Sequence, residues 1–219
     1  MYKAVIYDLF GTIVEPWDVE RHRATLNRLA NVLYVNANDF ARMWDYYAEQ
    51  GMNGTFGSIG EQLIRVCDAL SVHVQPEHVS HAESLLLADA RRYLTPTGDA
   101  LATMIRVKDL GLKSGVISNC GLEVPHLWKE LHYSHYIDAP IFSCISGVHK
   151  PHGGIYRQAL ERLGILPEQS LFVDDDPAFV EGARAVGLGA VLITNTPSTQ
   201  TNDLCVSRLS SILPLLTEG

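Results

Sequence analysis

The stretch that decides the fold is "AVIYDLFGTIV", residues 4–14. Four apolar or β-type residues lead directly into one acid, Asp8, and Gly11 follows three positions later. A short uninterrupted apolar run is typical of a strand that is buried on both faces of a parallel sheet. The sequence therefore predicts a strand over residues 3–8 with an acid at its carboxyl end.

A different pattern fills residues 16–94. Apolar residues recur there at spacings of three and four, which predicts about four helices with no strand between them. Glycines punctuate residues 51–60, "GMNGTFGSIG", and predict a mobile loop between two of these helices.

From residue 95 onward, strand and helix patterns alternate. Strands are predicted at 113–119, 141–147, 170–176 and 189–194, and helices at 100–111, 125–133, 153–164 and 178–187. Such alternation is typical of an α/β fold with a doubly wound parallel sheet, to which the first strand also belongs. The predicted core therefore consists of residues 1–15 and 95–219, and residues 16–94 form an inserted helical domain.

Composition excludes some classes of partner. The formal net charge is -8 with no basic block, which argues against nucleic acid or an anionic membrane surface. No window has the roughly 18 uncharged apolar residues of a membrane span, and the amino terminus does not have the pattern of a signal peptide. The cysteines are scattered without a C-x-x-C pair, at Cys67, Cys120, Cys144 and Cys205. We therefore expect a cytoplasmic protein with free thiols.

Polar residues gather where the predicted strands end. In open parallel sheets, ligands bind beyond the carboxyl ends of the strands. Asp8, Ser118 and the triple aspartate 174–176 all stand at such ends, and Lys150 follows a strand by a few residues. Neighbouring carboxylates repel one another, and a hard divalent cation with oxygen ligands relieves that repulsion. We therefore expect Mg²⁺ bound by Asp8 and Asp175, with a backbone carbonyl of the turn after Asp8 as a further ligand.

In this order, these residues resemble the haloacid dehalogenase superfamily, a group made up mostly of phosphatases with an aspartate nucleophile. Four motifs carry the resemblance: "YDLFGT" at 7–12, "VISN" at 116–119, "HKPHGGIY" at 149–156 and "FVDDD" at 172–176. The helical insertion resembles the first type of cap domain in that family. The resemblance implies a Rossmann-like core with a helical cap and a small-molecule substrate.

The resemblance also implies roles for individual side chains. Asp8 would attack the substrate and form a covalent aspartyl intermediate. Ser118, together with backbone N–H groups, would hold the transferring oxygens, and Lys150 would neutralise charge on the nucleophile and the substrate. Asn119, next to Ser118, is a candidate for orienting the bound ligand.

The metal site implied by the resemblance has one unusual neighbour. Asp175 would bind Mg²⁺, with Asp174 and Asp176 as further direct or indirect partners. In the family's phosphatases, the residue two after the nucleophile is an aspartate that acts as general acid and base, and its backbone carbonyl binds the metal. Phe10 occupies this position, so the carbonyl is kept and the acid is lost.

An aromatic residue at this position is also typical of the family's L-2-haloacid dehalogenases, which release halide without protonating it. Those enzymes use no metal, carry serine and asparagine where this chain has residues 174–176, and place a cap arginine beside the halide. Arg42 is the only arginine in the corresponding region, "ARMWDYYAEQ".

Three functions therefore stay open at this point. A magnesium-dependent phosphatase acting on a small phosphorylated metabolite is favoured, because the triple aspartate suits a cation. A metal-independent dehalogenase acting on a 2-haloacid is the alternative, and a catalytically weak metal-binding regulatory protein is the third. The sequence names neither the substrate nor the oligomeric state, for which a homodimer is one candidate.

Overall fold

The computed structural model of the chain describes residues 1–194 and 204–217. Within these residues, six parallel strands form one sheet in the order β3-β2-β1-β4-β5-β6. The strands are β1 Ala4–Tyr7, β2 Lys113–Ser118, β3 Ala139–Phe142, β4 Ser170–Asp174, β5 Gly189–Ile193 and β6 Cys205–Val206. The predicted α/β fold with a parallel sheet is confirmed.

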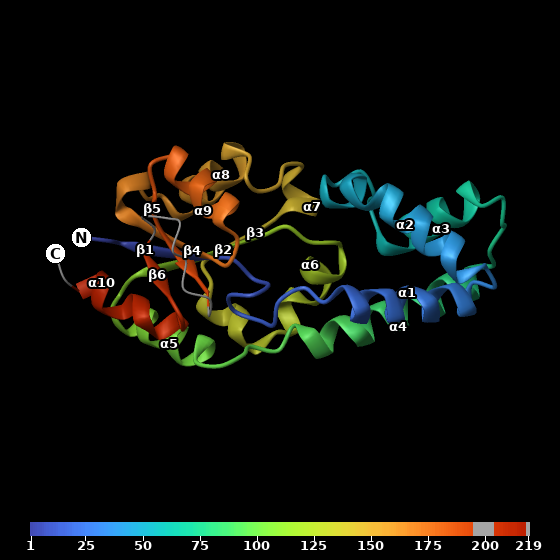
Figure 1. The fold of residues 1–219 in the computed structure, drawn as a ribbon, viewed down its shortest axis with the longest axis horizontal. Helices are drawn as coiled ribbons and strands as arrows, with labels where there is room; N and C mark the ends of the chain where they lie inside the picture. Colours follow the sequence, from blue (N-terminus) through green and yellow to red (C-terminus); the bar gives the residue numbers. More distant parts are fainter. Residues whose placement is uncertain (195–203, 218–219) are drawn as a thin grey trace.

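Helices cover both faces of the sheet, as Figure 1 shows. Successive side chains of a strand point to opposite faces, so Ala4 and Ile6 pack on one side while Val5 and Tyr7 pack on the other. Helices α8 (Gly153–Leu163) and α9 (Pro177–Ala185) cover the first side, and α5 (Ala100–Asp109) and α10 (Leu213–Thr217) lie across the other. The middle residues of the strands are apolar because both faces of the sheet are buried there.

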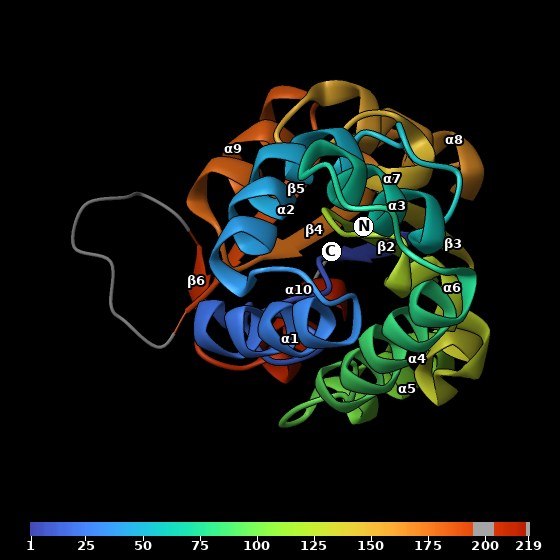
Figure 2. The same ribbon diagram turned by 90° about the vertical axis from the view of Figure 1, so that its right-hand side faces the viewer.

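Four helices separate β1 from α5, and the chain forms no named strand between them. They are α1 Val19–Val32, α2 Ala37–Met52, α3 Ile59–Ala69 and α4 Pro76–Tyr93. The side chains of Asp18, Asn36 and Ser58 accept hydrogen bonds from backbone N–H groups in the first turns of α1, α2 and α3, and α4 begins with proline. Figure 2 shows these helices stacked beyond the end of the sheet. The division into two domains at residues 15/16 and 94/95 stays a prediction.

Three predicted elements differ from the structure. The glycine-rich stretch 51–60 is loop only between Met52 and Ile59, because its ends continue α2 and α3. The strand predicted at 141–147 ends at Phe142 and is followed by the short helix α7 (Ser143–Ser146).

The helix predicted at 125–133 breaks into α6 (Glu123–Leu127) and two 3₁₀ turns, Trp128–Glu130 and His132–Tyr136. Further 3₁₀ turns span Pro167–Gln169 and Leu209–Ile212. Residues 195–203 and 218–219 of the predicted core lie outside the described residues.

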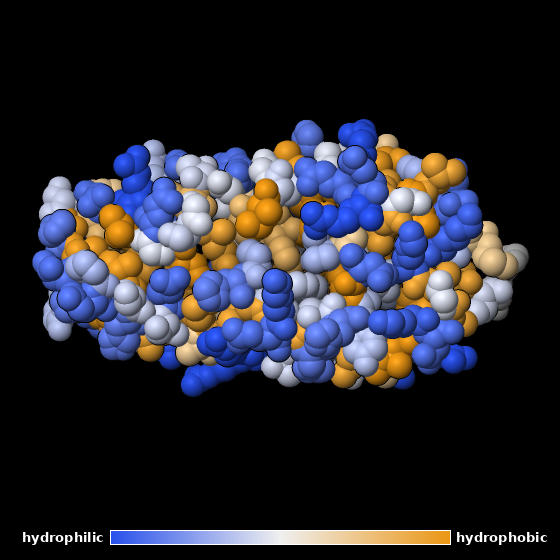
Figure 3. Space-filling view, turned by 180° about the vertical axis from the view of Figure 1, so that it is seen from behind, coloured by the Kyte–Doolittle hydropathy of each residue, from blue (hydrophilic) through white to orange (hydrophobic). Residues whose placement is uncertain are grey.

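The described part of the chain shows neither a membrane-spanning helix nor, on the face in Figure 3, one continuous apolar surface. Among the described residues, no helix has the length and apolar character to cross a membrane. Figure 3 shows one face on which hydrophilic residues are spread widely and hydrophobic residues form separate groups between them. That face therefore presents no single continuous apolar surface in its described part.

Candidate active site

The site begins where β1 and β4 lie side by side. Tyr7 pairs with Val173, and the backbone N–H of Asp8 donates to the carbonyl of Val173 at 2.8 Å. Asp8 and Asp174 are therefore neighbours at the carboxyl ends of adjacent strands. The strand order reverses at this pair, since β2 and β3 follow on one side of β1 and β4 to β6 on the other. Such a reversal opens a crevice that binds ligands in doubly wound sheets.

Lys150 joins these two acids. Its ammonium group is buried and donates to Asp8 Oδ1 and, at 2.6 Å, to Asp174 Oδ2. Asn119 holds the Lys150 backbone from both sides: its Nδ2 donates to the Lys150 carbonyl at 3.0 Å, and its Oδ1 accepts from the Lys150 N–H at 2.8 Å. Asn119, predicted to orient the ligand, thus positions the lysine and also lines the cavity described below.

The buried charges shift one another's titration. Burial raises the pKa of Asp8 to about 7, because the low-dielectric interior disfavours its anion; Lys150 opposes this shift and Asp174 adds to it. Burial disfavours the Lys150 cation, but the two carboxylates outweigh burial and raise its pKa. Two acids and one lysine carry a net negative charge when all are ionised, so the cluster favours either a proton or a further cation.

The donor set suits a hard divalent cation. Oxygens of Asp8, Asp174 and Asp175 all lie within 4.8 Å of one another, and Asp8 Oδ2 is buried with no hydrogen-bond partner among the described residues. The Asp175 side chain joins this cluster of oxygens by passing close to Gly11, where an added Cβ would lie 2.0 Å from Asp175 Oδ2. Only a residue without a side chain leaves that space, and the φ of +82° at Gly11 also favours glycine. Oxygen-only ligands of this kind fit Mg²⁺.

Asp176 has a different task from its two neighbours. Its carboxylate accepts a hydrogen bond from the N–H of Ala178 at 2.8 Å and caps the first turn of α9. It lines the cavity but lies outside the cluster of carboxylate oxygens formed by Asp8, Asp174 and Asp175. Its predicted part in metal binding stays a prediction, with the capping role as its observed contact.

Ser118 ends β2 and is fully buried, and among the described residues its hydroxyl has no partner of ordinary hydrogen-bond geometry, although it lies near the Cys120 thiol. It is not among the side chains that line the cavity. A buried hydroxyl without a partner costs about 1–3 kcal/mol, so an oxygen from outside the chain that accepted its proton would relieve that cost. Its predicted role in holding substrate oxygens remains a prediction.

Phe10 stands where the family resemblance leads one to expect an acid, and a second phenylalanine, Phe179, lies beside Lys150. Phe10 lines the cavity, and its ring lies 5.8 Å from that of Trp17 and 6.0 Å from that of Tyr93. The ring of Phe179 lies 4.7 Å from the ammonium nitrogen of Lys150, a cation–π arrangement. The Phe10 carbonyl as a metal ligand stays a prediction.

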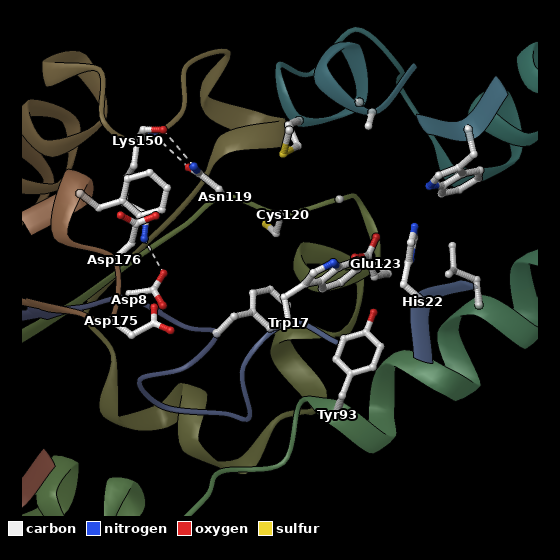
Figure 4. Close-up of a pocket in the computed structure, with 18 of the residues that line it drawn as sticks. Asp8, Trp17, His22, Tyr93, Asn119, Cys120, Glu123, Lys150, Asp175 and Asp176 are labelled. Carbon is white, nitrogen blue, oxygen red and sulfur yellow. Dashed lines mark hydrogen bonds and ion pairs between the residues drawn. The ribbon is translucent and has the colours of Figure 1, made fainter. Parts of the chain in front are cut away.

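A cavity of about 640 Å³ opens in front of these residues. Its walls come from the ends of the strands, from the loop after β2 and from helices α1, α2, α3 and α4. Figure 4 shows Asp8, Asp175, Asp176 and Lys150 at one end, and Trp17, His22, Tyr93 and Glu123 at the other. Gly51 and Met52, from the predicted loop, line the same cavity.

Sequence reasoning missed the four residues at the second end. Trp17 follows the turn after β1, Glu123 follows β2, and His22 and Tyr93 belong to α1 and α4. The one available signal was the place of Trp17 and Glu123 just beyond strand ends. Arg42, the candidate halide ligand, is exposed and pairs with Asp39 at 2.9 Å instead of lining the cavity.

The sequence as a whole identifies the class of protein. A haloacid dehalogenase-like hydrolase family model matches residues 2–187, and the chain belongs to this family of enzymes. It is 31% identical over 105 residues to a glyceraldehyde 3-phosphate phosphatase of Methanopyrus kandleri, a match that covers 46% of this chain and 44% of the relative. The matched region thus spans less than half of that phosphatase.

Two further relatives carry dehalogenase names. The chain is 26% identical over 230 residues to (S)-2-haloacid dehalogenase 4A of Burkholderia cepacia, with 99% of this chain and 96% of the relative covered. The structure of a 2-haloacid dehalogenase from Pseudomonas syringae superposes with a TM-score of 0.74 at 17% identity, covering 99% of this chain and 98% of the other. At that identity, the structural likeness concerns the fold alone.

Proposed function

We propose that this hydrolase is a magnesium-dependent phosphatase that acts on small phosphate monoesters through Asp8. The observation that carries the proposal is the convergence of carboxylate oxygens from Asp8, Asp174 and Asp175 within 4.8 Å of one another. A single buried lysine pairs with two of these acids. A site for halide release has no use for so many carboxylates, because they repel a leaving anion.

The proposed reaction has two steps. An oxygen of Asp8 attacks phosphorus, the bond from phosphorus to the leaving oxygen breaks, and an aspartyl phosphate forms. Water then attacks that phosphorus and releases inorganic phosphate and the Asp8 carboxylate. Lys150 holds Asp8 and offsets negative charge that develops on the transferring oxygens. Mg²⁺ held by Asp8 and Asp175 would supply further positive charge for the phosphoryl oxygens.

Phe10 limits the leaving groups that this site handles well. A general acid contributes about 10²–10⁴ in rate, and a phenyl ring cannot donate a proton. The proposal therefore favours esters whose leaving oxygen needs little protonation, unless another group in the cavity supplies the proton.

One observation favours dehalogenation as a second candidate. The ring of Phe10 forms an apolar wall with Trp17 beside Asp8, and such a wall suits the carbon chain of a haloacid, whose halide leaves without a proton. Against it, no arginine lines the cavity among the described residues.

One substrate panel separates the two candidates. p-Nitrophenyl phosphate, propyl phosphate and (S)-2-chloropropionate are each incubated with the protein in Mg²⁺ or in excess chelator. Our proposal expects phosphate release that depends on Mg²⁺ and no chloride release. Chloride release that is unchanged by chelator would replace the proposal with the second candidate.

A further inference from the structure

Glu123 is a buried acid that the proposed reaction does not use. It is the first residue of α6, its exposed fraction is 9%, and it lines the cavity at the end opposite Asp8. Within residues 1–194 and 204–217, its carboxyl group forms no ion pair with a lysine, arginine or histidine. The carboxyl group also folds over Gly121, where an added Cβ would lie 2.3 Å from Glu123 Oε2.

An unpaired acid in this position is costly. Burial raises the pKa of Glu123, since the carboxylate loses hydration without gaining a counter-charge. A cation that entered the cavity would remove that cost. Lys150 is the only lysine or arginine among the described residues lining the cavity, and its ammonium group already pairs with Asp8 and Asp174.

Aromatic rings stand beside Glu123. The Trp17 ring lies 6.3 Å from that of Tyr93 and 5.8 Å from that of Phe10, each edge to face. Burial and then the charge of Glu123 raise the pKa of Tyr93, in keeping with their shared end of the cavity. Aromatic faces attract ammonium groups through the negative charge of the ring face.

His22 does not oppose a cation here. Its ring lies 4.7 Å from that of Trp17, and burial lowers its pKa, against a smaller opposing effect of Asp45. The imidazole is therefore neutral near pH 7 and adds no positive charge to this end of the cavity.

We propose that Glu123, Trp17 and Tyr93 form a cation subsite that binds an ammonium group on the leaving alcohol of the substrate. The substrate class is then a phosphate monoester of an amino alcohol, whose leaving oxygen would take its proton from water or from another group in the cavity, since Phe10 cannot donate one. This inference rests on the proposed phosphatase function for its catalytic consequence. The two ends of the cavity match such a zwitterion, with Lys150 at the phosphate end and Glu123 at the amine end.

The kinetic test uses two esters of the same shape. Phosphocholine carries a quaternary ammonium group, and 3,3-dimethylbutyl phosphate replaces that nitrogen by carbon. We expect wild-type kcat/KM to favour phosphocholine by about tenfold or more, and Glu123→Gln to bring the ratio close to one, chiefly through KM. Glu130→Gln is the matched control, because Glu130 is exposed and pairs with Arg91 outside the cavity. Equal kcat/KM for both esters in the wild type would overturn the subsite.

A binding test keeps the subsite separate from the reaction. Tetramethylammonium chloride is titrated by calorimetry against sodium chloride as the control, with no phosphate ester present. Saturable binding that Glu123→Gln and Trp17→Leu each weaken supports the subsite, even if the protein hydrolyses no phosphate ester. Only variants that retain the wild-type circular dichroism spectrum are compared. The subsite is overturned if tetramethylammonium does not bind, or if it binds these variants as tightly as the wild type. This holds even if phosphatase activity is found.

Discussion

The two ends of the cavity are built in opposite ways. At the strand end, Lys150 pairs with Asp8 and Asp174, and Asn119 fixes the lysine backbone from two sides. At the helical end, Glu123 has no cation partner among the described residues, and Trp17 is 49% exposed. The two ends therefore differ in how their charges are satisfied: the strand end pairs its charges within the chain, whereas Glu123 at the helical end has no counter-charge among the described residues.

The largest expected effect on activity comes from a substitution of Asp8 at the strand end of the cavity. Asp8→Asn keeps the shape of the side chain but removes the attacking oxygen, so kcat/KM for p-nitrophenyl phosphate is expected to fall by about 10⁴-fold or more. Asp109→Asn is the control, since Asp109 lies at the exposed end of α5 and pairs with Arg106 in its own helix. Activity within tenfold of wild type would rule out Asp8 as the nucleophile.

Two further variants separate the expected roles of Asp175 and Asp176 in the triple aspartate. Asp175→Asn removes a member of the oxygen cluster, so the Mg²⁺ concentration for half-maximal activity is expected to rise by about 10–100-fold. Asp176→Asn is expected to leave this concentration nearly unchanged, because Asp176 caps α9 and asparagine also caps helices well. Magnesium titrations of phosphatase activity give both values. A larger shift for Asp176→Asn than for Asp175→Asn would reverse our assignment.

A third variant changes Phe10, which lines the cavity between the strand end and the helical end. Phe10→Asp is expected to raise kcat/KM for propyl phosphate by about tenfold, less than a full general-acid effect because the new acid is imperfectly placed. p-Nitrophenyl phosphate needs little protonation and should gain little. Phe10→Asn is the matched control, since it loses the same ring contacts with Trp17 and Tyr93 without gaining an acid. Equal losses on both esters would mean that Phe10 acts by packing.

The smallest expected effect concerns the ring over the lysine. Phe179→Leu keeps an apolar side chain but removes the aromatic face that lies 4.7 Å from Lys150 Nζ. We expect a loss of about 1 kcal/mol in stability, seen as a fall of about 2–4 °C in Tm. Because ion pairs with Asp8 and Asp174 hold the ammonium in place, kcat/KM should change by no more than a few-fold. A loss above about a hundredfold would show that Phe179 does more than pack.

Much of the strand end could be predicted from the sequence. The apolar runs before Asp8 and Asp174 identify buried parallel strands, and parallel strands bring their carboxyl ends to one edge. The sequence pattern predicted secondary structure less well where the backbone N–H and C=O groups can form hydrogen bonds either to a neighbouring strand or within a helical turn. Residues 143–146, Ser-Cys-Ile-Ser, form a short helix where a strand was predicted, and the pairing of β3 with β2 ends just before them at Phe142.

The sequence by itself determined the sheet, the helical insertion after the first strand and the meeting of Asp8 with Asp174 and Asp175. These follow from side-chain periodicity and from the geometry of parallel strands, which are local rules. Only the tertiary structure decided that Trp17, Tyr93 and Glu123 line one cavity with Phe10. The positions of those residues depend on how α1 and α4 pack beyond the sheet, and no spacing along the chain encodes that distance.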